Sequence, residues 1–387
     1  MRRMTLLTLL ALSGSLTASA QVSDPTRLPK MRVYVGTYTG PVSKGIYRLD
    51  FDPVSGTLTG KALAAETTNP SFLAISPDHK NLYAANEVGK TDGQPTGSIS
   101  SFAINPKTGD LTALNRQPSG GADPCYVVVD PTGKYVLTAN YSGGSVEVLP
   151  IVESGRLGAP TVTIRHQGSS IDPGRQTSSH AHAIDLDASG KVAIAADLGL
   201  DQLMIYRFDP QTGKLKANPT PFASVKPGSG PRHFAFHPDG KHAYAINEMA
   251  STVTAFEYDP AQAKLAEIQT ISTRSPGGKP GNSTAEILVH PSGKFVYGSN
   301  RGDDSLAIYA VEPASGTLKL VGHQATGGKT PRSFGIDPTG RFLIAANQDS
   351  STLVVFRVDR ETGRLQQVGE PLSVPAPVCV KFVPIEG

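Results

Sequence analysis

One phrase recurs along this chain, and its recurrence limits the possible folds more than any other feature. An apolar run ends in Asn or a similar small polar residue, and successive copies are 47 to 57 residues apart. The seven residues at this place are Thr37, Asn86, Asn140, Asp197, Asn247, Asn300 and Asn347. A repeat of roughly 50 residues is typical of propellers and arrays, in which each copy is one supersecondary unit.

Tight turns divide each copy into short strands. Six copies are preceded by a turn such as HPDGK at 237–241 or DPTGR at 337–341, where Pro presets φ and Gly supplies a positive φ. Alternating runs such as TVTAFEYD at 252–259 follow, then a second turn and a further run. Four short strands per copy and seven copies predict an all-β fold: a seven-bladed β-propeller with four antiparallel strands per blade.

The two ends of the chain predict how the ring closes. The first copy lacks an inner strand, and the last run, PVCVKF at 377–382, resembles the inner strands PSFLAI and PRSFGI. We therefore expect a propeller domain over 31–387 in which the C-terminal strand completes the N-terminal blade, since an open sheet edge invites aggregation. The insert 165–180 should form a loop over one face.

The first 20 residues have a basic start, a short apolar run and Ala18-Ser19-Ala20, which is typical of a secretory signal peptide. A flexible leader over 21–30 and a periplasmic or secreted location are expected. Cys125 and Cys379 each lie in an apolar run, so two buried thiols are favoured over a disulfide. The net charge is +3 without a basic run, so we expect neither nucleic acid nor a membrane span, but a small-molecule partner and a monomer.

In such a blade the start of the inner strand and the residue after the Asn lie on the same face. Residues that differ between copies at these places are candidates for function. One inner-strand position holds Ser71, Cys125, His182, Arg232, Ala285 and Arg332, and the next holds Phe72, Tyr126, Ala183, His233, Glu286 and Ser333. The place after Asn holds Tyr38, Glu87, Tyr141, Leu198, Glu248, Arg301 and Gln348. Several ionisable groups should therefore converge around one mouth of the ring.

Less functional interpretations apply to some of these residues. The repeated Asn is expected to tie the strand end to a neighbouring loop, and His237 and His290 should be turn residues on the far face. His180 and His182 alternate on one strand and could form half of a metal site. No Cys or carboxylate cluster at ligand spacing joins them, so we predict neither metal nor cofactor.

Five phrases together resemble the seven-bladed propeller lactonases, which include propeller-type 6-phosphogluconolactonases and carboxy-cis,cis-muconate cyclases. They are VGTYT (35–39), RQTSSHAH (175–182), DLGLD (197–201), GPRHFAFHPDGKHAYAINE (230–248) and SNRGDDSLAIY (299–309). The resemblance implies that His182, Arg232, Glu248 and Arg301 are the active residues, with His180 second to His182. Further substrate contacts are expected from Arg175, His233, Glu286, Asn247, Asn300, Arg332, Glu87 and Tyr38.

The resemblance implies an exported, metal-independent lactonase, a carboxylic ester hydrolase that opens a sugar lactone. Glu248 or His182 would be the general base, and Arg232 and Arg301 would hold the oxyanion or an anionic group of the substrate. Because 6-phosphogluconolactone is a cytoplasmic metabolite, an unphosphorylated lactone stays open as the substrate. A cycloisomerase of the muconate-cyclase type would use the same four residues, and a non-catalytic binding propeller is the third alternative.

Overall fold

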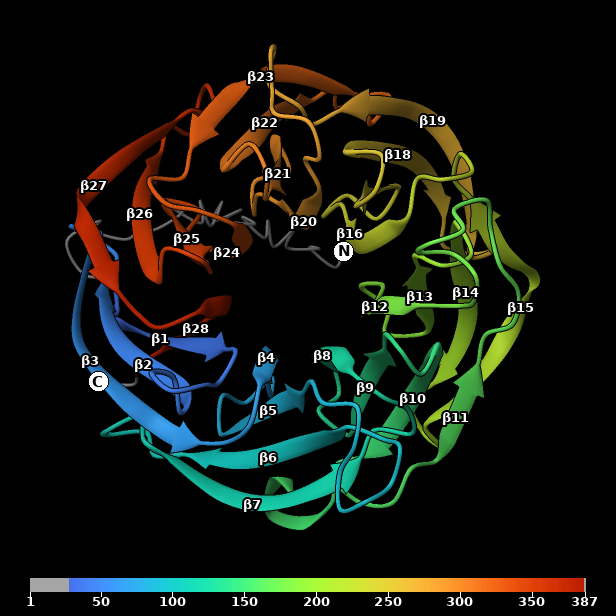
Figure 1. Ribbon diagram of the computed structural model, residues 1–387, viewed down its shortest axis with the longest axis horizontal. Helices are drawn as coiled ribbons and strands as arrows, with labels where there is room; N and C mark the ends of the chain where they lie inside the picture. The colour runs from blue at the N-terminus through green and yellow to red at the C-terminus, as the bar shows by residue number, and fades with distance from the viewer. Residues whose placement is uncertain (1–27, 386–387) are drawn as a thin grey trace, which may run out of the picture.

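The computed structural model describes residues 28–385, and these form seven four-stranded antiparallel sheets arranged as blades around one axis (Figure 1). No α-helix occurs in this range; a 3₁₀ turn, η2 (Glu153–Gly155), is the one helical segment there. The predicted all-β, seven-bladed propeller is confirmed. The predicted signal peptide, 1–20, and residues 21–27 of the leader lie outside the described range.

The blades follow one another in chain order, each written here from its inner to its outer strand. Blade 1 contains β28 (Pro377–Pro384), β1 (Met31–Thr37), β2 (Gly45–Asp52) and β3 (Thr57–Glu66). Blade 2 contains β4 (Pro70–Ile75), β5 (Asn81–Asn86), β6 (Ser98–Ile104) and β7 (Leu111–Pro118). Blade 3 contains β8 (Pro124–Val129), β9 (Tyr135–Asn140), β10 (Ser145–Pro150) and β11 (Val162–Arg165). Blade 4 contains β12 (Ala181–Leu186), β13 (Val192–Asp197), β14 (Gln202–Asp209) and β15 (Lys214–Ser224).

The remaining three blades repeat the pattern. Blade 5 contains β16 (Pro231–Phe236), β17 (His242–Asn247), β18 (Thr252–Asp259) and β19 (Lys264–Ser272). Blade 6 contains β20 (Thr284–Val289), β21 (Phe295–Asn300), β22 (Ser305–Val311) and β23 (Leu318–Ala325). Blade 7 contains β24 (Pro331–Ile336), β25 (Phe342–Asn347), β26 (Thr352–Val358) and β27 (Leu365–Ser373).

Ring closure occurs as predicted. The C-terminal strand β28 pairs antiparallel with β1, with Met31 opposite Pro384 and Val35 opposite Val380. The first and last parts of the chain thus share one sheet, and blade 1 has the same four strands as the others. Both cysteines are buried and free, as expected.

Each second strand is buried along almost its whole length, because it lies inside its sheet and both sheet faces pack against neighbouring blades. Large aromatic rings recur on these strands, among them Tyr34, Tyr83, Tyr244 and Tyr297. Their hydroxyls donate to carbonyl oxygens in an outer turn of the next blade, for example Tyr244 to Gly316 at 2.9 Å and Tyr297 to Gly363 at 2.8 Å. These bonds join blade to blade at one face of the ring.

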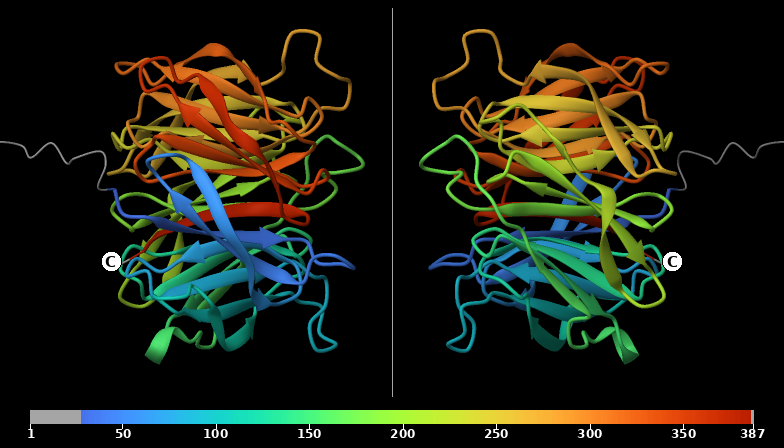
Figure 2. Two further views of the ribbon diagram at one scale, coloured as in Figure 1. Left: turned by 90° about the vertical axis from the view of Figure 1, so that its left-hand side faces the viewer. Right: turned by 90° about the vertical axis from the view of Figure 1, so that its right-hand side faces the viewer.

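The two faces differ in their loops (Figure 2). We call the face with the Pro-x-Gly turns, such as 237–241, the turn face. The mouth face carries the starts of the inner strands and the residues after the repeated Asn, and the loop 166–180 extends over it. No helix of the described residues is long and apolar enough to cross a membrane.

Candidate active site

A repeated backbone hydrogen bond sets the positions of seven side chains at the mouth face. The residue after each second strand donates its N–H to the carbonyl just before the inner strand of the same blade, as Glu248 does to Gly230 at 2.7 Å. The other six pairs are Tyr38–Ala376, Glu87–Asn69, Tyr141–Asp123, Leu198–His180, Arg301–Ser283 and Gln348–Thr330. The backbone is the same in every blade, so the chemistry at the mouth depends on which side chain each blade presents.

Glu248 is the centre of the cluster at the mouth. Its Oε2 accepts ion pairs from Arg232 Nε at 3.1 Å and Arg301 Nη2 at 2.9 Å, and its Oε1 lies 2.8 Å from Arg175 Nη2. Burial alone would raise the pKa of Glu248, but Arg301, Arg232 and Arg175 lower it to about 2. This carboxylate stays ionised at neutral pH and is a weak proton acceptor.

Two of these arginines are fixed by the sheet framework. Arg232 Nη1 donates to the Ala285 carbonyl at 2.7 Å, and Arg301 Nη2 donates to the Thr284 carbonyl at 2.9 Å. Burial lowers the pKa of Arg301 to about 10 against the opposing effect of Glu248, so the guanidinium remains charged. Within the described residues, Arg232 Nη2 and Arg301 Nη1 donate no hydrogen bond to protein, which leaves N–H groups for a ligand.

Behind Arg232 lies a buried relay of hydrogen bonds. His233 lies 2.7 Å through Nδ1 from Glu286 Oε1 and 3.0 Å through Nε2 from Arg232 Nη1, and Ser333 Oγ donates to Glu286 Oε2 at 3.1 Å. Burial lowers the pKa of His233 to about 4, although Glu286 opposes this shift. A neutral His233 donates from Nδ1 and accepts at Nε2, which matches both contacts. His233 and Glu286 therefore position Arg232.

His182 is a buried, neutral imidazole beside the cluster. Its pKa lies well below the ordinary value, first because it is buried and then because Arg232 and His233 are near. Its Nδ1 is 3.6 Å from the Sγ of Cys125, whose thiol pKa is raised by burial. His180 lies further out: its ring stacks on Tyr141 at 4.5 Å, and its Nδ1 is 3.0 Å from the Tyr141 carbonyl oxygen.

The loop 166–180 brings Arg175 to Glu248, and Asp197 anchors both ends of this loop. Asp197 Oδ2 lies 2.6 Å from His166 Nδ1, and Oδ1 accepts the His180 N–H at 2.8 Å. Asp197 stands where most other copies have Asn, in the blade that the inserted loop precedes. Unlike the two framework arginines, the Arg175 side chain is 45% exposed.

The other predicted contact residues lie in different surroundings. Arg332 is partly exposed, with its Cζ 5.2 Å from the centroid of the Tyr38 ring, and Tyr38 Oη donates to Glu87 Oε2 at 2.8 Å. Asn247 and Asn300 are fully buried, and their amides donate to loop groups such as Thr252 Oγ1 and the Thr273 carbonyl. These two amides have the loop-tying role expected of the repeated Asn, and they contact none of the ionisable mouth residues in the described part of the chain.

Deeper along the inner strands lie groups that the sequence analysis did not select. Tyr126 Oη donates to Asp185 Oδ1 at 2.8 Å, and burial raises the pKa of Asp185 to about 7. Lys381 Nζ lies 4.6 Å from the centroid of the Phe72 ring. The available signal was a charged residue inside each apolar inner strand, AHAIDL and PVCVKF.

The residues of the mouth offer little to a metal ion, since three guanidiniums surround Glu248. Across 28–385, three metal-type ligand atoms come within 4.8 Å of one another in one group, His237, Asp239 and His242, which lies at the turn face. Burial would raise the pKa of Asp239, but the Lys241 N–H and the two imidazoles bring it down to about 2. His237 Nε2 is also 2.8 Å from the Gly293 carbonyl, so this group joins two neighbouring blades.

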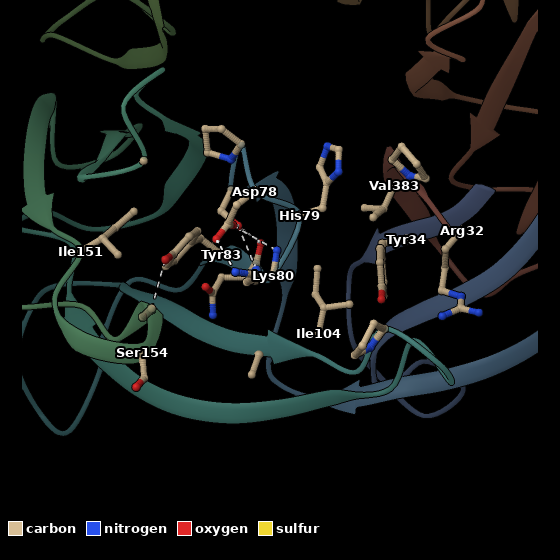
Figure 3. A pocket seen from close by; sticks show the side chains of 18 of the residues that line it. Arg32, Tyr34, Asp78, His79, Lys80, Tyr83, Ile104, Ile151, Ser154 and Val383 are labelled. Carbon is tan, nitrogen blue, oxygen red and sulfur yellow. Dashed lines mark hydrogen bonds and ion pairs between the residues drawn. The ribbon is translucent and has the colours of Figure 1, made fainter. Parts of the chain in front are cut away.

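A cavity of about 700 Å³ opens at the turn face between blades 1, 2 and 3 (Figure 3). Its labelled lining includes Arg32, Tyr34, Tyr83 and Ile151, with Ser154 at its edge. No predicted site residue lines it. The convergent charged groups and the largest described cavity therefore lie at opposite faces of the ring.

Comparisons with known proteins agree with the arrangement at the mouth. A 6-phosphogluconolactonase of Bacillus subtilis is 39% identical over 350 residues, which is 90% of this chain and 97% of the relative. One from Formosa agariphila is 35% identical over 310 residues, 79% of this chain and 86% of the relative. The structure of a periplasmic gluconolactonase of Pseudomonas aeruginosa superposes with a TM-score of 0.87 at 34% identity, covering 92% of this chain and 100% of the other.

A family profile gives the same result over nearly the whole described chain. The profile described as "Lactonase, 7-bladed beta-propeller" matches residues 32–382. This span begins within β1 and ends within β28, so it includes all seven blades and every residue of the mouth cluster. The chain belongs to the seven-bladed β-propeller lactonase family.

Proposed function

We propose that this protein is an exported, metal-independent hydrolase of a sugar lactone. Family membership places it among lactone-opening carboxylic ester hydrolases. One observation carries the rest of the proposal: a carboxylate with three guanidiniums bonded to it lies at the same face as a buried neutral imidazole. That combination offers a proton acceptor and preorganised cations for an oxyanion.

The pKa values divide the catalytic roles. Glu248, with a pKa of about 2, is poorly suited to take a proton from water, and its three ion pairs suit it to hold arginines in place. His182 is unprotonated at neutral pH and lies near Arg232, where the oxyanion would form. His182 is therefore the general base, and Glu248 is a positioning residue for Arg232 and Arg301.

The reaction then follows in two steps. His182 takes a proton from a water molecule as its oxygen bonds to the lactone carbonyl carbon, and the carbonyl oxygen becomes an oxyanion facing the free N–H groups of Arg232 and Arg301. As the oxyanion collapses, the bond from that carbon to the ring oxygen breaks, and the His182 imidazolium returns its proton to the leaving alkoxide. The product is an open-chain hydroxy acid.

The test is hydrolysis of δ-gluconolactone and 6-phosphogluconolactone at pH 7 by purified protein 21–387, after dialysis against EDTA. We expect activity above the spontaneous rate that EDTA leaves unchanged, lost in His182→Asn and kept within about tenfold in His180→Asn. Loss of activity with EDTA and its return with a divalent metal would contradict metal independence. Absence of hydrolysis of any lactone would favour a binding propeller.

The proposed export rests on residues 1–20 and on the periplasmic neighbour. Expression of the full chain with cell fractionation and intact mass of the product tests it. A product that begins near Gln21 in the periplasm or medium is expected. A full-length product retained in the cytoplasm would contradict it.

A further inference from the structure

The ring divides into two halves with different charge arrangements. Blades 4, 5 and 6 present His182, Arg232, Glu248 and Arg301, the groups assigned to the reaction. Blades 7, 1 and 2 present Arg332, Tyr38 and Glu87, and their inner strands β24, β28 and β4 lie across the ring from β12 and β16 (Figure 1). The second half has no role in the steps described above.

Arg332 differs from the other arginines of the mouth because it lacks a partner. Arg175, Arg232 and Arg301 all pair with Glu248. No hydrogen bond or ion pair joins the Arg332 guanidinium to any residue within 28–385, and its described contact is the face of the Tyr38 ring. Atoms surround the side chain on most sides, yet it remains partly accessible. An unpaired charge in such a place is costly unless a ligand supplies the counter-ion.

Two unsatisfied polar atoms lie in the same sector. Ser71 holds the place in β4 that Arg332 holds in β24, and its buried Oγ has no hydrogen-bond partner among the described residues. Gln348 follows β25 in the blade of Arg332, and its Oε1 is buried and equally unpaired in that part of the chain. Buried polar atoms are normally satisfied, so such atoms mark places where a hydroxyl or anion of a ligand can bond.

The total charge at the mouth also favours an anion. Four guanidiniums, Arg175, Arg232, Arg301 and Arg332, face two carboxylates, Glu248 and Glu87. Arg332 contributes to lowering the pKa of Arg232 and of Arg301, so these cations repel one another. A ligand anion would relieve this repulsion.

We propose that Arg332, in the sector formed by blades 7, 1 and 2, is an anion subsite that receives a phosphate or carboxylate group carried by the lactone away from its ring carbonyl. The planar guanidinium can bind either group through two parallel hydrogen bonds. Ser71 and Gln348 would bond the hydroxyls between the anionic group and the ring. The inference rests on the proposed lactonase function and names its substrate class as anionic lactones.

The test compares Arg332→Ala and wild type on neutral δ-gluconolactone and on 6-phosphogluconolactone at pH 7. We expect kcat/KM for the phosphorylated lactone to fall about 10- to 100-fold, mainly through KM, and that for the neutral lactone to change less than about twofold. Arg332→Lys should recover part of the loss, since it keeps the charge but not the fork. Arg357→Ala is the matched control, because Arg357 also lies over a ring, Phe342 at 4.7 Å, in a strand outside the mouth cluster.

Binding of reaction products separates this inference from the proposed function. In calorimetry, 6-phosphogluconate and glucarate probe phosphate and carboxylate, and gluconate serves as the reference. Weaker binding of either dianion in Arg332→Ala, with gluconate unchanged, would support the subsite and identify its group even if neither lactone were hydrolysed. Equal losses on neutral and anionic compounds, or no loss on the anionic ones, would overturn it.

Discussion

The two faces of the ring each hold a carboxylate with a pKa of about 2, yet the two carboxylates do different things. At the turn face, Asp239 binds two imidazoles and a backbone N–H of its own turn. At the mouth, Glu248 gathers three arginines from the loop 166–180, β16 and the end of β21. A depressed pKa therefore does not identify a site by itself; groups that converge from several blades do.

Repetition separates the faces in the same way. The turn face repeats its contacts, such as tyrosine hydroxyls bonded to carbonyls of the next blade. The mouth repeats the backbone hydrogen bond but varies the side chain that it presents. In a closed ring, stability can come from what the blades share and chemistry from what they do not.

The largest effect is expected from exchanging the two carboxylates for amides. Glu248→Gln should lower kcat/KM for a lactone at least about 100-fold, because Arg232 and Arg301 lose the charge that holds them. Asp239→Asn should leave kcat/KM unchanged and lower the free energy of unfolding by about 1 kcal/mol. Lactone kinetics and urea unfolding of both variants measure this. Similar activity losses in the two would break the contrast between the faces.

The second prediction concerns pH. Because burial and nearby cations hold the pKa of His182 well below 6.5, its basic form persists as the pH falls through that value. We expect kcat/KM to stay level from pH 7.5 to below pH 6.5 and to fall only at lower pH. Rates corrected for spontaneous hydrolysis give the profile. A midpoint at the ordinary histidine value, in a stably folded protein, would rule out the assigned base.

A smaller effect is expected from the anchor of the loop. Asp197→Asn should weaken the contact with His166, loosen 166–180 and misplace Arg175, lowering kcat/KM about tenfold. Asp209→Asn, an exposed turn carboxylate in the same blade, is the control and should change nothing. Limited proteolysis should show faster cleavage within the loop for Asp197→Asn alone. Unchanged kinetics and cleavage would mean that the loop is held by other contacts.

The smallest effect belongs to the contacts between blades. Tyr244→Phe removes the hydroxyl that donates to the Gly316 carbonyl and should lower the free energy of unfolding by about 1 kcal/mol with full activity. Tyr297→Phe should give the same result in the next blade. Thermal unfolding with lactone kinetics tests both, and an activity loss in either would contradict a purely structural turn face.

The fold could be predicted almost completely from sequence, because turn chemistry and strand period repeat seven times and each copy corrects the next. The site could be predicted only as far as the backbone register reaches. Register places Arg232, Glu248 and Arg301 at one face, but whether a guanidinium finds a carboxylate depends on side-chain direction, and so the free state of Arg332 was not foreseeable. The pairing of Arg175 with Glu248 depends on a loop without a repeat, and Asp185 and Lys381 lie deeper than the positions compared.

Ring closure has a consequence for the order in which the protein can assemble. Strand β1 obtains its inner neighbour from β28, more than 300 residues later in the chain. A nascent or partly translocated chain therefore has a first blade of three strands and an exposed edge until its last residues arrive. Synthesis and transport must finish before the propeller can lock, and removal of the final strand would leave the ring unsealed even though every residue of the mouth cluster was present.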